Sequence, residues 1–357
     1  MTTTATPTPE SPLSIASSWR IVGMVLLCVR FVQGWIYWGG GSRRFIYAPS
    51  KLDPSAHHWM ANKFQTAMPG ALLGMDHLVS YMLQHFYLLY VGVIVFSAVE
   101  LIAGLFLMVG FLTRLSALVT IGLSFVLMLL FGWQGATCID EWTMAASNFG
   151  MGATLFLGGA GAYSIDAWLM KRRTKAPSSW YKWVGSDPLP ERILDPMMKF
   201  FFIVTVLFVV LTYSYYRGSV IGPFHGGPVS PAKHHVKISN PVLRNDGAVT
   251  FDAYIDGGTA DVPAHIARVV LLTGDKTPIE TWSGNQLAAL DKKAIVNDYI
   301  YNKFKPGVES LEAEVGAKAT INLPPAPQTA TFAPGNYVVQ VLTIDDKKFS
   351  APVVLNN

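Results

Sequence analysis

Long apolar stretches constrain this chain of 357 residues more than any other feature of its sequence. The run from Ile21 to Gly39 is apolar except for Arg30 and Gln33. As a helix rising about 1.5 Å per residue, it would cross about 30 Å of hydrocarbon. Further runs follow at His85–Leu112, Leu115–Trp133, Trp142–Met170 and Met198–Tyr216. The sequence therefore predicts four transmembrane helices in one bundle and a fifth helix that follows a linker.

The composition agrees with a membrane protein. Hydrophobic residues make up 51% of the chain and charged residues only 14%, whereas about 25% is usual for soluble domains. This balance argues against an ordinary cytosolic enzyme. With two cysteines and no Cys-x-x-Cys pattern, the chain also lacks the framework of a disulfide-rich domain or a zinc finger.

The positions of the basic residues predict the orientation. The stretch Met170–Lys199 holds seven Lys and Arg against three Asp and Glu, and such loops stay on the cytosolic side. This placement exports the loop Gly40–Gln84, the loop around Cys138 and everything after Tyr216. The exported first loop nevertheless carries four bases (Arg43, Arg44, Lys51 and Lys63), which the orientation rule disfavours and which anion binding would explain.

The region after Tyr216 has the alternating pattern of half-buried strands. Val249, Phe251, Ala253 and Ile255 share one face of such a strand. Similar patterns at 265–272, 319–323, 337–344 and 349–355 predict an antiparallel β-sandwich of Ig-like type. The spacing within Asn285–Phe304 is helical, so we expect a helix beside the sandwich.

The predicted organisation has five parts. They are a flexible cytosolic tail (1–19), a four-helix transmembrane domain (20–170), a basic cytosolic linker (171–197), a fifth transmembrane helix (198–216) and an exported β-sandwich domain (217–357).

Arg30 and Glu100 are ionisable groups inside predicted spans, where charge is expensive and usually functional. Their depths predict that they form a pair. A salt bridge that locks two helices is one interpretation. Contact with a quinone, or transfer of its protons, is the other, and the two are compatible.

Arg43 and Arg44 follow three consecutive glycines at the end of the first span. A flexible backbone there would let two guanidinium groups converge on a sulfonate or phosphate. The alternative is that each arginine reaches toward lipid headgroups.

Cys138 lies in an exported loop, where a single thiol tends to react. Its neighbours Asp140 and Glu141 would raise its pKa unless arginines compensate, and Trp142 follows them. Cys28, inside the first span, is interpreted as a small core residue.

No cofactor motif is visible. The histidines at 57, 58, 77 and 85 lack a metal-ligand spacing, and the glycines between 150 and 161 fit close helix packing better than a nucleotide loop. We therefore expect no bound metal, haem, flavin or nucleotide and no nucleic-acid partner. Any electrons must then pass through a diffusible carrier or another protein.

Three segments carry a resemblance to a known family. They are Arg30–Gly34, Thr137–Trp142 and Asn148–Gly152. With the four spans, they resemble the DoxD subunit of thiosulfate:quinone oxidoreductase, a member of the wider DoxX-like membrane family. The fifth span and the sandwich resemble its DoxA partner, so the two subunits look fused.

This resemblance implies oxidation of two thiosulfates to tetrathionate on the periplasmic side, with a membrane quinone as electron acceptor, in the cytoplasmic membrane of a prokaryote. Thiosulfate, quinone and the lipid bilayer are then the partners, and homo-oligomerisation is left open. We hypothesise that Cys138 forms an S-thiosulfonate adduct, which a second thiosulfate attacks while Arg43 and Arg44 hold the sulfonates.

The remaining candidate residues would serve the quinone and its protons. They are Arg30, Glu100, Asp140, Glu141 and Trp142. Two other functions stay open: a membrane protein that binds or transports sulfur oxyanions, and a non-catalytic assembly subunit.

Overall fold

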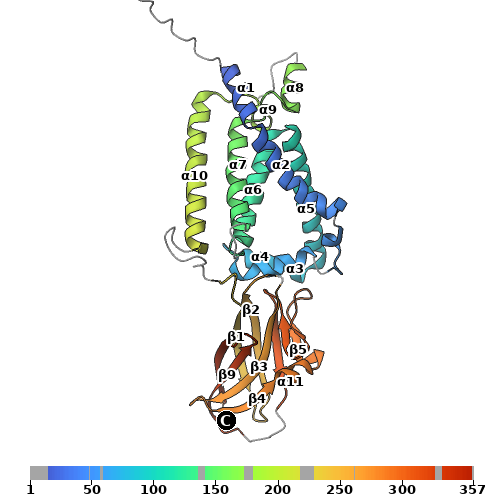
Figure 1. Cartoon of the computed structure of the whole chain (residues 1–357), viewed down its shortest axis with the longest axis vertical. Helices are drawn as coiled ribbons and strands as arrows, with labels where there is room; N and C mark the ends of the chain where they lie inside the picture. Colours follow the sequence, from blue (N-terminus) through green and yellow to red (C-terminus); the bar gives the residue numbers. More distant parts are fainter. Residues whose placement is uncertain are drawn as a thin grey trace, which may run out of the picture. The chain divides into compact units, whose positions relative to one another are not determined.

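A computed structural model describes residues 15–47, 49–56, 59–135, 141–172, 180–217, 229–260, 262–325 and 332–355. Helices occupy the first part of the chain and strands the last part (Figure 1). The longer helices are α1 (Ile15–Val25), α2 (Leu27–Ser42), α3 (Met60–Ala67), α4 (Met75–Gln84), α5 (Phe86–Val109), α6 (Thr113–Phe131), α7 (Glu141–Gly158), α8 (Ile165–Arg172) and α10 (Glu191–Arg217). Shorter turns are the π-helix η1 (Arg43–Tyr47), η2 (Pro49–Leu52), η3 (Met68–Gly70) and α9 (Tyr181–Val184).

Three helices of the described residues are long and apolar enough to cross a membrane: α5, α6 and the stretch Glu191–Tyr216 of α10. A fourth span results if α1 and α2, which bend by 50° at Leu26, are counted together. Helix α7 is not among them, because Glu141, Asn148 and several glycines dilute its apolar residues. The count of five spans therefore stays a prediction.

The predicted continuous helix Trp142–Met170 is wrong. Helix α7 ends at Gly158, and Gly159 and Gly161 follow with φ of 68°, a left-handed conformation that glycine adopts without strain. The chain then turns and resumes as α8. Gly161 also lies against Gly23, where an added Cβ would come within 2.3 Å of the Gly23 Cα.

Glycines bring α2 and α5 into close contact. A Cβ added at Gly41 would lie 2.8 Å from the Leu101 backbone nitrogen, and one at Gly104 would lie 2.2 Å from the Trp38 nitrogen. Small residues permit such approach between membrane helices. The run Gly39 to Gly41, expected to be flexible, is therefore helical and continues directly into η1.

The C-terminal region forms an antiparallel β-sheet domain with two sheets. One sheet has the order β1-β2-β8-β5, and the other has the order β10-β9-β3-β7-β6, with β4 also paired to β3. The strands are β1 (His235–Leu243), β2 (Val249–Gly257), β3 (Ala264–Thr273), β4 (Pro278–Ser283), β5 (Ile295–Asn297), β6 (Lys305–Pro306), β7 (Leu311–Ala313), β8 (Lys318–Leu323), β9 (Gly335–Thr343) and β10 (Lys348–Leu355). The Ig-like type of the domain stays a prediction.

Apolar side chains at alternate positions along the strands form the core of this domain. The alternating apolar residues predicted for β2 are all buried, as are Val339 and Val341 of β9. The helix expected over Asn285–Phe304 is wrong. Only the short helix α11 (Gly284–Ala288) and the 3-10 turn η4 (Lys292–Ala294) form, because Ile295 and its neighbours pair with β8 instead.

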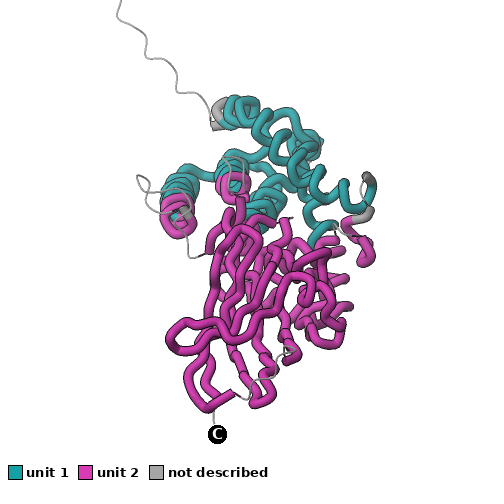
Figure 2. The backbone as a smooth tube through the Cα atoms, turned by 60° about the horizontal axis from the view of Figure 1, so that its bottom comes forward, with its two compact units in different colours: residues 1–47, 96–124, 147–207 teal, residues 48–95, 125–146, 208–357 magenta. Residues whose placement is uncertain are grey.

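The chain divides into two compact units (Figure 2). Unit 1 comprises residues 1–47, 96–124 and 147–207, and unit 2 comprises residues 48–95, 125–146 and 208–357. Helices α5, α6, α7 and α10 contribute to both units. The boundaries predicted at residues 19, 170, 197 and 216 stay predictions.

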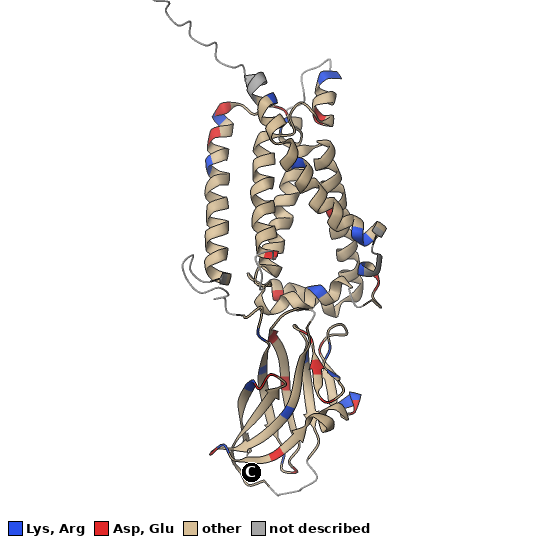
Figure 3. Ribbon diagram, viewed as in Figure 1, with Lys and Arg blue, Asp and Glu red and all other residues tan. Residues whose placement is uncertain are grey.

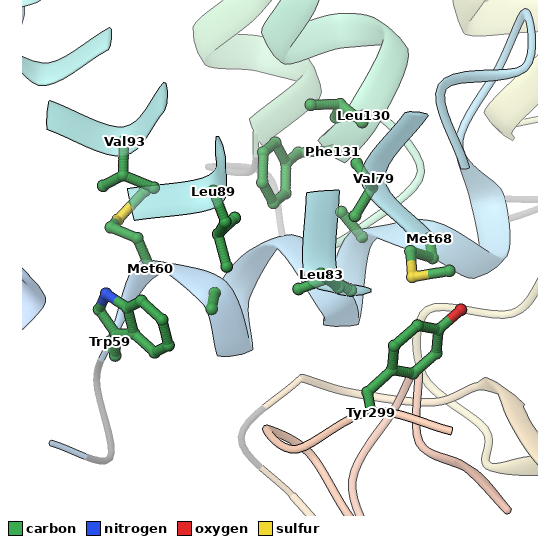
Figure 4. Packing of buried hydrophobic residues seen from close by; sticks show 12 residues of the cluster. Trp59, Met60, Met68, Val79, Leu83, Leu89, Val93, Leu130, Phe131 and Tyr299 are labelled. Carbon is green, nitrogen blue, oxygen red and sulfur yellow. The ribbon is translucent and has the colours of Figure 1, made fainter. Parts of the chain in front are cut away.

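Unit 2 has an apolar core in which helices and the β-sheet domain take part. Figure 4 shows side chains from α5, α6 and the C-terminal region gathered around α3 and α4. Tyr299, from the loop after β5, belongs to this cluster together with Trp59, Met68, Leu83 and Phe131. Residues 59–84 of the first loop are thus a packed part of unit 2.

In unit 1, Asp166 of α8 fixes the connections between helices. It is fully buried and accepts hydrogen bonds from the backbone of Leu112 and Thr113 at the start of α6. The hydroxyls of Tyr181 and Ser186 also donate to it, at 2.9 and 2.7 Å. A carboxylate at a helix N-terminus satisfies free N–H groups there, so Asp166 ties the segment around α9 to α6.

Candidate functional site

Helix α3 positions the first charged group of the site in unit 2. Met60, Gln65 and Ala67 are buried, so Lys63, on another face, keeps its side chain 39% exposed. The Lys63 Nζ donates to Glu141 Oε1 at 2.9 Å and to Gln134 Oε1 at 3.2 Å. It also lies 5.3 Å from the centre of the Phe131 ring, within the range of a cation–π contact.

Through these contacts, the Lys63 ammonium binds the residues that flank one short segment of the chain. Gln134 lies just before residues 136–140 and Glu141 just after them. The predicted site residues Cys138 and Asp140 belong to that segment and lie outside the described residues. An ammonium group has three donors, and Lys63 uses two of them here, so one donor direction is left for an anion.

The residues before this segment are anchored on the end of α3. The Gln134 amide donates to the Thr66 carbonyl at 2.8 Å, and the Trp133 indole donates to the Ala67 carbonyl at 2.9 Å. The last carbonyls of a helix have no partner within the helix, so these side chains satisfy them. Helix α3 therefore fixes both Lys63 and the start of the segment that carries Cys138.

The β-sheet domain holds the opposite face of α3. The fully buried Gln65 amide donates to the carbonyls of Asn302 and Gly316, both at 2.9 Å, and its oxygen accepts from the Asn302 nitrogen at 3.0 Å. Nearby, the Ser80 and Tyr299 hydroxyls lie 2.7 Å apart. These contacts could not be predicted from the sequence, since a glutamine that becomes buried in a short loop helix resembles any polar surface residue.

The two other residues predicted beside Cys138 have definite partners. Glu141 opens α7, where the helix dipole favours a negative charge, and it pairs with Lys63. The Trp142 indole donates to the Thr212 hydroxyl at 3.0 Å, and its ring meets that of Tyr213 at 5.2 Å. Their part in a quinone or proton relay stays a prediction.

Unit 1 holds the second charged group, an ion pair between Arg44 of η1 and Glu100 of α5. Each side chain is only 13% exposed, and the Arg44 guanidinium also lies over the Phe96 ring. Gly40 lies beside the Glu100 carboxylate, since a Cβ added at Gly40 would be 3.5 Å from its Oε2, an ordinary van der Waals contact. Figure 3 shows how few charged residues the long helices carry between their ends.

The predicted pair between Arg30 and Glu100 is wrong. Arg30 is buried and donates to the carbonyls of Ala160 and Tyr163 at 2.6 and 2.7 Å, where the chain turns after α7. Glu100 pairs with Arg44 because α2 and η1 extend past Gly39 and bring Arg44 to α5. The arginine of the first span therefore holds a turn together.

Arg43 and Arg44 do not converge on a common point. The exposed Arg43 donates from Nε to the Gly39 carbonyl at 3.1 Å, whereas Arg44 turns to Glu100. Their predicted role as sulfonate ligands stays a prediction. Cys28, expected in the core, is instead exposed on the surface of α2.

A buried polar cluster in unit 1 was missed at the level of sequence. The Gln33 amide nitrogen of α2 donates to the Thr120 hydroxyl of α6 at 3.1 Å and to the Asn148 carbonyl of α7 at 2.9 Å. One turn further along α2, the Tyr37 hydroxyl lies 3.0 Å from the Thr120 carbonyl and 2.7 Å from the Ser124 hydroxyl. The sequence feature that could have indicated this cluster is the presence of polar residues within the apolar runs.

The cluster is incompletely satisfied. Gln33 is 0% and Asn148 2% exposed, yet the side-chain oxygens Oε1 of Gln33 and Oδ1 of Asn148 have no hydrogen-bond partner among the described residues. A buried acceptor left in this way costs about 1–3 kcal/mol. Two acceptors on different helices thus favour a ligand that brings donors.

Within the described ranges, no three His, Cys, Asp or Glu residues gather as metal ligands would. The groups that do gather are an ammonium beside the segment of Cys138, an ion pair and a cluster of amides and hydroxyls. Such groups bind anions and move protons.

The fold and these sites define a helical membrane protein that carries an antiparallel β-sheet domain and buried polar groups within its apolar helices. The model of "TQO small subunit DoxD" matches residues 25–194, and that of "TQO small subunit DoxA" matches residues 216–351. The chain belongs to these two families of thiosulfate:quinone oxidoreductase (TQO) small subunits, fused in one polypeptide.

Among solved structures, the chain matches one named "Structure of Iho670 Flagellar-like Filament". The identity is 8%, the match covers 46% of this chain and 98% of that chain, and the TM-score is 0.21. A likeness at this level carries no argument about fold or function.

Proposed function

We propose that this protein oxidises two thiosulfates to tetrathionate and passes the two electrons to a membrane quinone. The observation that carries the proposal is the position of Lys63, whose ammonium meets Gln134 and Glu141 at the two ends of the segment that contains Cys138. A cation held there attracts a small dianion to the thiol. The match to TQO small subunits supports the substrate and the acceptor.

The proposed chemistry has two balanced steps. The Cys138 thiolate and the terminal sulfur of one thiosulfate form a new S–S bond and release two electrons, which the quinone takes up with two protons. A second thiosulfate then attacks the sulfur of the adduct, the bond to Cys138 breaks, tetrathionate leaves and the thiolate is restored. The free donor direction of Lys63 would hold a sulfonate oxygen and offset the repulsion between the two anions.

We propose the cytoplasmic membrane of a prokaryote as the location, with the N-terminus in the cytosol and the β-sheet domain in the periplasm. The excess of Lys and Arg in Met170–Lys199 supports this orientation. Thiosulfate would then reach the segment of Cys138 from the periplasm, and quinone would arrive from the bilayer.

The decisive experiment is an anaerobic assay of the purified full chain with thiosulfate and decylubiquinone, with tetrathionate and quinol both measured. We expect one tetrathionate per quinol. A protein that only binds or transports sulfur oxyanions would bind thiosulfate and reduce no quinone.

The Cys138→Ser variant tests the thiol step, with Cys28→Ala as the matched control at the other cysteine. We expect Cys138→Ser to lose at least about 99% of turnover, since covalent catalysis cannot proceed without the nucleophile. Full turnover in Cys138→Ser would leave direct electron transfer from thiosulfate as the mechanism.

A further inference from the structure

The unsatisfied amides of unit 1 point to a ligand of a particular kind. The acceptors, Oε1 of Gln33 and Oδ1 of Asn148, lie on side chains that are almost completely buried. A group that satisfies them must donate hydrogen bonds. Thiosulfate has only acceptors and two negative charges, so it fits neither these oxygens nor the apolar helices around them. A hydroquinone has two hydroxyl donors on an apolar ring and fits both.

Polar groups lead from these amides toward Glu100. The negative charge of Glu100 acts on the Tyr37 hydroxyl without a direct hydrogen bond between the two side chains. Tyr37 contacts the Ser124 hydroxyl and the Thr120 carbonyl, and the Thr120 hydroxyl accepts from Gln33. Hydroxyl groups both accept and donate protons, so a proton can pass directly between Tyr37 and Ser124 by rearrangement of their hydrogen bond. The Thr120 hydroxyl donates to the Ala117 carbonyl, so water would have to carry the proton between Ser124 and Thr120 and between Glu100 and Tyr37.

Quinone reduction needs protons that thiosulfate does not supply. Two thiosulfates become tetrathionate by losing two electrons and no protons, whereas a quinone becomes a hydroquinone by gaining two electrons and two protons. The protons must come from water at the membrane surface. Arg44 and Glu100 are partly exposed, and the polar groups described above lead from Glu100 toward the buried amides.

We infer that Gln33 and Asn148 bind the hydroquinone headgroup, and that Glu100 and the hydroxyls of Tyr37, Ser124 and Thr120, together with water between them, deliver its protons. This inference rests on the proposed function. Because the free groups are acceptors, the site binds the reduced form, which has donors, more tightly than the oxidised form. Gln33 and Asn148 are thus binding residues, and Tyr37 is a positioning residue for protons.

The test measures two electron acceptors in the purified full chain. Decylubiquinone takes up protons with its electrons, whereas ferricyanide takes up electrons alone. In Gln33→Leu and Asn148→Leu, we expect the quinone rate with thiosulfate to fall at least about tenfold, or about 1.4 kcal/mol. The ferricyanide rate should stay within about twofold. Thr154→Val is the matched control, since Thr154 is an exposed polar residue of α7 that donates to the Gly150 carbonyl of its own helix.

Binding is measured separately, from the quenching of tryptophan fluorescence by decylubiquinol. The Kd should rise about tenfold in Gln33→Leu and Asn148→Leu and stay unchanged in Thr154→Val. An unchanged Kd in the two leucine variants would mean that water satisfies the amides and would overturn the inference. Equal loss of both electron-acceptor rates in variants of unchanged unfolding temperature would overturn it too.

Tyr37→Phe keeps the inference testable if the leucine variants fold poorly, since it removes only a hydroxyl. We expect unchanged decylubiquinol binding, a slower quinone rate and a larger solvent isotope effect, with the ferricyanide rate unaltered. Wild-type quinone kinetics in Tyr37→Phe would contradict the proton route. A wild-type protein that reduces neither acceptor with thiosulfate would instead refute the proposed function.

Discussion

Lys63 is a residue whose charge has both a structural and a chemical use. It pairs with Glu141, which neutralises part of the charge, and keeps one donor direction for an anion. A hydrogen bond to a charged group contributes about 1.5–3 kcal/mol. The charge, and not merely the length of the side chain, should therefore determine how thiosulfate binds.

We predict that Lys63→Gln raises the KM for thiosulfate about tenfold or more, while the KM for quinone stays unchanged. Lys63→Arg should keep most of the affinity. Steady-state kinetics at several salt concentrations measure this, because salt screens the attraction of a charged site but not that of a neutral one. The control is Lys237→Gln, an exposed lysine on β1. An unchanged KM in Lys63→Gln would refute the role of Lys63.

Arg44 and Glu100 should depend on each other. Removing one partner of a largely buried ion pair leaves a charge without compensation, and the cost, up to about 3–5 kcal/mol for a fully buried pair, is smaller for this partly exposed one. We predict that Glu100→Gln lowers the unfolding temperature in detergent. The double variant with Arg44→Met should recover most of the loss, because it removes both charges. A double variant less stable than either single variant would contradict the pairing.

At the scale of elements, α3 connects two parts of unit 2. Gln65 on one face of α3 contacts the β-sheet domain, and Lys63 on the other face contacts the residues that flank the segment of Cys138. A substitution on the Gln65 face of α3 should therefore also change the position of Lys63. In the proposed function, the β-sheet domain then acts on thiosulfate binding through α3.

We predict that Gln65→Leu destabilises the protein by about 3 kcal/mol or more, since it leaves buried groups of Asn302 and Gly316 without partners. Faster hydrogen exchange in α3 and a higher KM for thiosulfate should accompany the loss. Gln84→Leu, at the exposed end of α4, is the control. If α3 exchanges as slowly as in the wild type, the coupling is absent.

The helices and strands that could be predicted are those in which the same pattern of apolar residues repeats along the whole element. Apolar runs located α5, α6 and α10, and alternation located β2, β3, β9 and β10, because burial on one face repeats along the chain. The end of the first span was missed, since packing of Gly41 against α5 keeps three glycines helical. This extension is also why Arg44, and not Arg30, meets Glu100.

The candidate site was predictable only in part. The sequence shows Lys63 and Glu141 as charged residues of loops that are predicted to be exported, but their pairing depends on contacts between distant segments. Gln33 and Asn148 belong to the segments that carry the family resemblance, but the sequence does not indicate their role. Their missing partners are a property of the folded helices, and no spacing in the sequence reveals them.

At the scale of the whole molecule, the fusion joins a DoxD region and a DoxA region, and non-covalent contacts within unit 2 already hold parts of these regions together. Gln65 with Asn302, Ser80 with Tyr299 and Trp59 with Tyr301 all connect the first loop with the C-terminal domain within unit 2. Covalent continuity between residues 217 and 229 should therefore be dispensable.

We predict that a chain cut between residues 217 and 229 and expressed as two pieces will copurify through a tag on either piece. The contacts named above supply the affinity, so Gln65→Leu should reduce the yield of the complex. Analysis of the purified material on a gel gives the stoichiometry. Two pieces that are both made but separate during purification would contradict this prediction.

The distance along the chain between Gln65 and its partners has a consequence for biosynthesis. Gln65 precedes Asn302 by 237 residues and Gly316 by 251 residues. A ribosome makes α3 early, and the strands that complete its surroundings emerge last. Until translation ends, Lys63 sits on a helix without its support. If the proposed function holds, truncated nascent chains would thus be inserted in the membrane yet inert toward thiosulfate, and the proposed thiol chemistry would begin only when the protein is complete.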